Sequence, residues 1–70
     1  MIVEVVTYPG GELVKVDVGS KDFVPVAVVL RRLGYRPYEV VVTVNGELVT
    51  EDDVVRDGDL VEVYKVMSVG

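Results

Sequence analysis

The sequence has no cysteine and no histidine, and these two absences remove several kinds of chemistry. Without cysteine the chain can form no disulfide and has no thiol nucleophile. Without histidine it also lacks the commonest general base, and the two residues together are the usual ligands of zinc. We therefore expect a protein that is not itself an enzyme and that binds no metal or other cofactor.

Positive charge is also scarce, because seven Lys and Arg residues stand against twelve Asp and Glu residues, for a net charge of −5. Nucleic-acid-binding proteins cluster their cations, so no nucleic-acid partner is expected. No apolar run approaches the roughly 20 residues that span a bilayer, and the N-terminus has no signal-peptide pattern. These features predict a cytoplasmic protein, monomeric when free, with no membrane partner.

Hydrophobic residues, by contrast, make up half of the sequence, and valine dominates among them. Their β-branched side chains favour strands, and apolar and polar residues alternate along several segments. The predicted strands cover residues 2–8, 13–18, 38–44, 47–49 and 60–67. Turns are predicted at Pro9-Gly10-Gly11, Asn45-Gly46 and Asp57-Gly58-Asp59, where proline and glycine supply the required backbone angles.

One segment has a helical period instead of a strand period. Its apolar residues recur three and four positions apart: Phe23, Val26, Ala27, Leu30 and Leu33. Ser20 or Asp22 is expected to cap the first turn, and Gly34 is expected to end the helix in a left-handed conformation. The sequence thus predicts a single helix after the first two strands.

The predicted order, β-β-α-β-β-β, gives one helix and enough strands for one sheet, in a single domain of residues 1–70. This is an α+β chain with the β-grasp, or ubiquitin-like, arrangement: a mixed sheet with the helix packed on one face. The last strand is expected beside the first, and residues 67–70 are expected to form a flexible C-terminal tail. The strand residues predicted to face the helix are Val3, Val5, Val14, Val16, Val42, Val44, Leu48, Val61 and Val63.

The opposite face of the predicted sheet carries an unusual number of apolar residues. Alternation places six of them there: Ile2, Val6, Leu13, Val41, Tyr64 and Val66. Scattered apolar residues are ordinary on surfaces, but a contiguous group is typical of a binding face. We expect Val6, Val41, Tyr64 and Val66 to dock on a partner, because they surround the strand that leads into the tail.

Two stretches resemble a known family: VNGELV, from Val44 to Val49, and DGDLVEVYKVMSVG, from Asp57 to Gly70. Together they resemble the small sulfur carriers ThiS and MoaD, whose last strand runs into a short tail ending on glycine. The resemblance implies that an adenylating enzyme similar to ubiquitin-activating enzyme uses ATP to activate the carboxylate of Gly70. Sulfur then forms a thiocarboxylate, which a sulfur-acceptor synthase uses in thiamin, molybdopterin or tRNA thiolation pathways. Ser68 and Val69 would be the tail threaded into the activating enzyme.

The tail departs from the family pattern at one position, since these carriers typically end in two glycines and Val69 occupies the penultimate place. Three interpretations follow: an activating enzyme that accepts valine, a natural chain that continues past Gly70, or a lost carrier function. Two other functions also stay open beside the carrier. One is a non-covalent β-grasp binding module similar to TGS domains, which would not need Gly70. The other is a ubiquitin-like modifier conjugated to lysine through Gly70, which would share the activation step.

Overall fold

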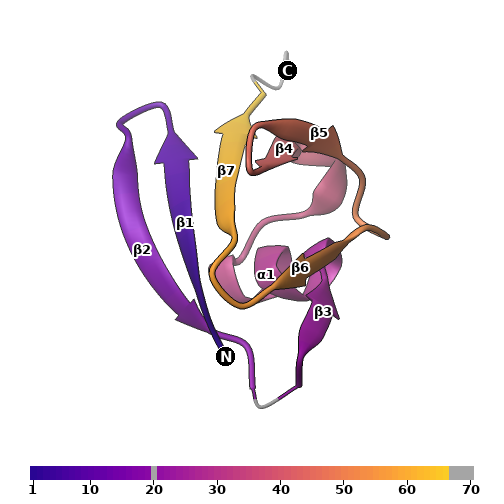
Figure 1. Cartoon of the computed structure of the whole chain (residues 1–70). Coiled ribbons are helices and arrows are strands. Elements are labelled where there is room, and N and C mark those ends of the chain that lie inside the picture. The colour runs from indigo at the N-terminus through magenta and orange to yellow at the C-terminus, as the bar shows by residue number, and fades with distance from the viewer. Residues whose placement is uncertain (20, 67–70) are drawn as a thin grey trace.

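Seven strands, one α-helix and one 3-10 helix make up residues 1–19 and 21–66, the part of the chain that the computed structural model describes (Figure 1). In chain order they are β1 (Ile2–Tyr8), β2 (Glu12–Asp17), β3 (Phe23–Pro25), α1 (Val26–Leu33), the 3-10 helix η1 (Pro37–Glu39), β4 (Val40–Val44), β5 (Glu47–Val49), β6 (Val54–Arg56) and β7 (Leu60–Lys65).

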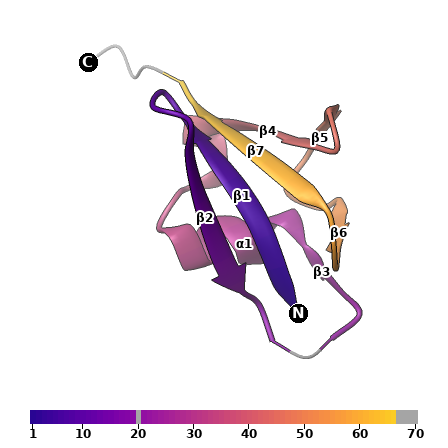
Figure 2. The same cartoon turned by 60° about the vertical axis from the view of Figure 1, so that its left-hand side comes forward.

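Five of the strands form one mixed sheet in the order β2-β1-β7-β4-β5. The last strand, β7, is parallel to β1 on one side and antiparallel to β4 on the other, which confirms its predicted place beside the first strand. Figure 2 shows α1 lying across one face of β1 and β2. One helix on one face of a mixed sheet is the β-grasp arrangement, as the sequence predicts.

Valine and leucine side chains from α1 and the facing side of the sheet form the core. Seven residues predicted for this core are buried: Val3, Val5, Val16, Leu30, Val42, Val61 and Val63. Val44 and Leu33 pack at its margin. Val26, on the predicted apolar face of the helix, is fully buried as well. Val29 of α1 and Val55 of β6 are also fully buried, so the core extends beyond the predicted set.

Two predicted core residues, Leu48 and Val14, are exposed instead. The Asn45-Gly46 turn has two residues, so β5 pairs with Thr43 opposite Leu48. Residues opposite each other in an antiparallel pair share a face, and Leu48 therefore lies with Thr43 on the side away from α1. Val14 lies opposite the buried Val5, but it belongs to the edge strand β2 and remains 36% exposed.

The helix begins later than predicted and is capped differently. Pro25 is its N-cap residue, and no side chain of the described residues caps it; Asp22 does not, and Ser20 lies outside those residues. The backbone N–H groups of Val26 and Ala27 instead donate to the carbonyls of Asp53 and Glu51, at 2.8 and 3.0 Å. The loop after β5 thus supplies the acceptors that a side-chain cap would give.

The other end of α1 follows the prediction. Gly34 adopts the left-handed conformation at φ 84°, and its N–H donates to the carbonyl of Arg31 at 3.1 Å. Beyond it, η1 replaces the predicted start of the next strand, so β4 begins at Val40 rather than at Tyr38. Pro37 opens this 3-10 turn, a position where its missing N–H costs little.

A second, two-stranded sheet was not predicted. It pairs β3 with β6, and Val24 lies opposite Val55 with both side chains buried. Phe23, predicted on the buried face of the helix, belongs to β3 and is 52% exposed. Strand alternation turns Phe23 away from the face of the buried Val24, and the guanidinium of Arg56, which lies opposite it, is 5.8 Å from the centre of its ring in a cation–π contact.

The turns at Asn45-Gly46 and Asp57-Gly58-Asp59 are confirmed, and they are joined to each other. Both residues of the first turn have positive φ, 51° for Asn45 and 85° for Gly46, as its tight geometry requires. The Asn45 side chain then accepts from the N–H of Leu60 at 2.9 Å and donates to the Asp59 carboxylate at 3.0 Å. One amide thereby fixes the β4–β5 hairpin to the start of β7.

The longest helix of residues 1–19 and 21–66 is α1, with eight residues, and none there is long and apolar enough to cross a membrane.

We expect Val55→Ala to lower the free energy of unfolding by about 2 kcal/mol, because it removes two methyl groups from a fully buried site. Leu48→Ala is the matched control, since its side chain is 74% exposed; its effect should stay within about 0.5 kcal/mol. Urea denaturation followed by circular dichroism measures both. Equal losses for the two variants would contradict the assignment of Val55 to the core and of Leu48 to the surface.

Candidate functional site

The sheet face away from α1 carries an apolar cluster around the end of β7, which we call the outer patch. It consists of Val6, Tyr8, Leu13, Val41, Tyr64 and Val66. The strand register brings these residues together, because Val6 lies opposite Leu13 and Tyr64 lies between Tyr8 and Val41. Exposed fractions of 37% for Tyr64, 40% for Val41 and 42% for Val66 leave much of the patch open to a partner.

At the centre of the outer patch, the rings of Tyr8 and Tyr64 stack. Their centroids are 4.7 Å apart and their planes differ by 7°. The parallel pairing of β1 with β7 sets Tyr8 beside Tyr64, so each ring limits the rotation of the other. A fixed aromatic pair offers a partner a large apolar surface that loses little side-chain entropy on binding.

One carboxylate, that of Glu62, lies beside the tyrosines and is hydrogen-bonded at both oxygens. Tyr8 donates its hydroxyl proton to Oε2 at 3.1 Å, and the Thr43 hydroxyl donates to Oε1 at 3.3 Å. The strand register explains these two bonds, since Glu62 lies opposite Thr43 on β4 and opposite Val6 on β1, two positions before Tyr8. The carboxylate therefore holds the edge of the aromatic pair in place.

The pKa values of both tyrosines are raised above their usual range. For Tyr8 the main cause is its hydrogen bond to Glu62, followed by partial burial, since both favour the protonated hydroxyl. For Tyr64 the main cause is partial burial, followed by the negative charge of Glu62. Both hydroxyls are therefore protonated donors at neutral pH.

The structure places all four residues predicted for docking, Val6, Val41, Tyr64 and Val66, in the outer patch. Ile2, predicted on the same face, lies at the start of β1 opposite Asp17 and is separated from Val6 by Glu4. The tail residues Ser68, Val69 and Gly70 lie outside the described part of the chain.

Sequence reasoning missed Tyr8. The alternation along β1 is enough to predict that Tyr8 faces outward, because Val6 is predicted outward and Tyr8 follows it by two positions.

The outer patch reaches the end of β7, where the described chain stops. The N–H of Val66 donates to the carbonyl of Glu39 at 3.0 Å, which extends the pairing with β4 by one residue beyond Lys65. Four residues follow Val66 in the sequence. In residues 1–19 and 21–66 no group of three or more Asp and Glu side chains is placed to hold a metal ion. The features that stand out are therefore an apolar face and the chain end next to it.

Two comparisons with known proteins agree with this geometry. The model of the ThiS family matches residues 4–68, nearly the whole chain. Among solved structures, the chain is similar to the crystal structure of the thiamine biosynthesis protein ThiS from Geobacter metallireducens. The two are 27% identical with a TM-score of 0.68, and the alignment covers 100% of both chains.

We expect Glu62→Gln to lower the pKa of Tyr8, because the substitution removes the charge that raises it. Because folding raises the pKa of Tyr8, its protonated hydroxyl stabilises the folded protein below pH 10, the ordinary tyrosine value. This contribution to stability is lost as the pH rises through the raised pKa. The wild type should therefore lose more stability than Glu62→Gln above that pH. Ultraviolet titration of tyrosinate measures the pKa, and denaturation at several pH values measures the stability.

Tyr8→Phe identifies which titration belongs to Tyr8. Unchanged tyrosine titration in Glu62→Gln would contradict the role of the carboxylate in the outer patch.

Proposed function

The chain belongs to the ThiS family of sulfur carriers, and we propose from this premise that Gly70 is its acyl carrier. An adenylating enzyme of the ubiquitin-activating type would join the Gly70 carboxylate to the AMP portion of ATP, releasing pyrophosphate. Attack by sulfide sulfur on the acyl carbon would then expel AMP and leave a C-terminal thiocarboxylate. In this cycle the chain is a protein co-substrate, and the chemistry is supplied by its partners.

The observation that carries this proposal is the position of the outer patch at the end of β7. The last hydrogen bond of the described chain, from Val66 to Glu39, fixes that end beside Val41 and Tyr64. Four extended residues span at most about 14 Å, so the Gly70 carboxylate stays within that distance of Val66. An enzyme that binds the outer patch therefore has the carboxylate within reach of its own active site.

The outer patch has the properties of a docking surface rather than of a catalytic site. Interface energy concentrates in a few buried aromatic anchors, and the stacked Tyr8 and Tyr64 are the largest side chains of the patch. Glu62 is already hydrogen-bonded to Tyr8 and Thr43, which reduces the cost of covering it. We assign Tyr8 and Tyr64 as the anchors, with Val6, Val41 and Val66 as the surrounding contacts.

The tail and the destination of the sulfur follow from the same premise. Ser68 and Val69 would thread into the activating enzyme, and Val69 requires a channel that accepts a β-branched side chain before Gly70. The similar protein of Geobacter metallireducens is named for thiamine biosynthesis, which favours a sulfur acceptor in the thiamin pathway over molybdopterin or tRNA thiolation.

Incubation with a purified adenylating enzyme of this type, ATP and sulfide should raise the mass of the chain by about 16 Da, the difference between oxygen and sulfur in the acyl product. Intact-mass spectrometry measures the gain, and fragmentation should place it on Gly70. A variant lacking Gly70 is the matched control and should keep its mass. An unchanged wild-type mass, with the enzyme active on another ThiS-type carrier, would contradict the proposal, and a lysine-linked adduct would favour the modifier.

Tyr64→Ala should lower kcat/KM for this reaction about 30-fold, because losing an aromatic anchor costs about 2 kcal/mol of binding. Most of the loss should appear in KM, since the reacting carboxylate is unchanged. Phe23→Ala is the matched control, an exposed aromatic residue on β3, outside the outer patch, and should react like the wild type. Equal kinetics for Tyr64→Ala and the wild type would remove the outer patch from the proposed interface.

A further inference from the structure

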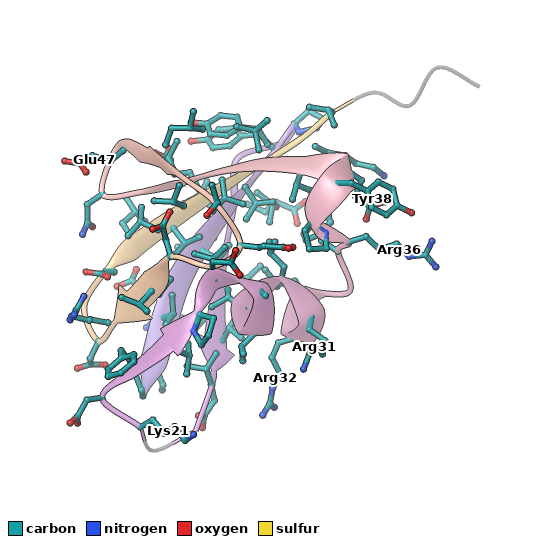
Figure 3. All side chains as sticks on the ribbon, turned by 90° about the vertical axis from the view of Figure 1, so that its right-hand side faces the viewer. Lys21, Arg31, Arg32, Arg36, Tyr38 and Glu47 are labelled. Carbon is teal, nitrogen blue, oxygen red and sulfur yellow. The ribbon has the colours of Figure 1, made fainter. Side chains whose placement is uncertain are left out.

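A groove of about 640 Å³ opens at the edge of the main sheet, where β5 is shorter than its neighbour β4. We call it the edge groove. Most of its lining is apolar: Leu30, Pro37, Tyr38, Val40, Val41, Val42, Leu48, Val49, Thr50 and Glu51. Figure 3 shows the side of the molecule that bears η1 and α1, with Tyr38 and Arg36 extending from η1 at the end of β4 opposite Glu47.

The floor of the edge groove is a stretch of β4 whose backbone lacks a strand partner. The bond from Val66 to Glu39 shows that odd-numbered residues of β4 direct their N–H and C=O groups toward β7. Even-numbered residues therefore direct theirs toward β5, which pairs with Val42 and Val44 and then ends. The N–H and C=O of Val40 face the groove with no strand opposite them among residues 1–19 and 21–66.

No residue of β5 lies opposite Val40. Continuing the register of β5 by two residues would set Glu51 opposite Val40, because Val49 lies opposite Val42. Glu51 has instead turned toward α1, where its carbonyl accepts from the N–H of Ala27 at 3.0 Å. Val40 is nevertheless in an extended conformation, with φ −137° and ψ 157°, which suits strand pairing.

We propose that the edge groove binds an extended segment of a partner protein, which pairs with Val40 and continues the line of β5. Backbone pairing at an open sheet edge supplies part of the affinity, and pockets for alternate side chains supply the selectivity. On the side away from the core, the bound segment would cover exposed apolar surface of Val41, Tyr38 and Leu48, which are 40%, 76% and 74% exposed. Its residues facing that side are therefore apolar or β-branched.

Charge selects a basic rather than an acidic segment. Glu51 lines the edge groove, and the exposed Asp52 follows it in the chain. Arg36, the residue before η1, does not line the edge groove; its guanidinium donates to the Tyr38 hydroxyl at 3.0 Å. This chain has a net charge of −5, so its complementary partner is a segment that carries Lys or Arg next to its apolar residues.

This interface does not rest on the sulfur-carrier cycle. It shares Val41 with the outer patch but needs neither Gly70 nor the Tyr8–Tyr64 pair. A carrier could lack it, and a chain that is never adenylated could have it, so the test below is independent of the mass measurement.

The test is a nuclear magnetic resonance titration of the ¹⁵N-labelled chain with a hexapeptide that is acetylated and amidated at its ends. Its first four residues alternate valine and threonine, and its last two are lysines. The amide of Val40 should shift downfield, and its solvent exchange should slow at least about tenfold, because it gains a hydrogen bond. The neighbouring amide of Val41 faces β7 and is the internal control. It should show neither change.

Two peptide controls and two variants complete the design. N-methylation of alternate residues should abolish the response of Val40, since it removes backbone donors. Glutamates in place of the lysines should weaken the response, since they reverse the charge. Glu51→Lys should weaken binding of the basic peptide about fivefold, through a side chain at the groove rim. Glu12→Lys, exposed on the edge strand β2, should leave the affinity unchanged.

Three results would overturn the proposal. The first is an unchanged Val40 amide at saturating peptide, and the second is an equal response to the acidic peptide. The third is protection of Val40 that rises with protein concentration without any peptide, which would make a second copy of the chain the occupant.

Discussion

Parallel pairing between β1 and β7 is the contact from which the other features of this chain follow. A parallel pair cannot be closed by a tight turn, so β2, α1 and the strands after it form the connection between the two. The last strand, β7, consequently lies at the centre of the sheet, and its own Val61 and Val63 are fully buried. The same register sets Tyr8 against Tyr64, which gives the outer face its most rigid feature. Stability and recognition therefore depend on one strand contact.

Strand β4 connects two surfaces of this chain, the outer patch and the edge groove. Val41 belongs to the outer patch, whereas the backbone of Val40 faces the edge groove. Neighbouring residues of one strand would thus contact the two proposed partners, because side chains and main-chain groups both alternate in direction. An activating enzyme and a basic strand could occupy the two surfaces at once only if they avoid each other around Val41.

Most of the main sheet could be predicted from the sequence, because its strands alternate cleanly and its turns contain Asn-Gly, Asp-Gly and Pro-Gly-Gly. The outward direction of Leu48 could also be predicted from the sequence, since a two-residue turn at Asn45-Gly46 puts Leu48 opposite Thr43. The start of α1 could not be predicted, because the backbone carbonyls of Glu51 and Asp53 replace a local side-chain cap, and they lie 24 and 27 residues from the N–H groups that they accept from. In the site, alternation predicts which residues face outward. The Tyr8–Tyr64 stack and the bonds to Glu62 depend on the parallel register, which no local pattern specifies.

The side chain of Asn45 joins two turns that are fourteen residues apart in the sequence, through its bonds to Asp59 and Leu60. This tie has a chemical weakness, because asparagine followed by glycine is the sequence most prone to lose its amide nitrogen with age. Deamidation would leave a carboxylate that still accepts from Leu60 but can no longer donate to Asp59. Two negative charges would then lie side by side at the beginning of β7, and the link between the two turns would be weakened.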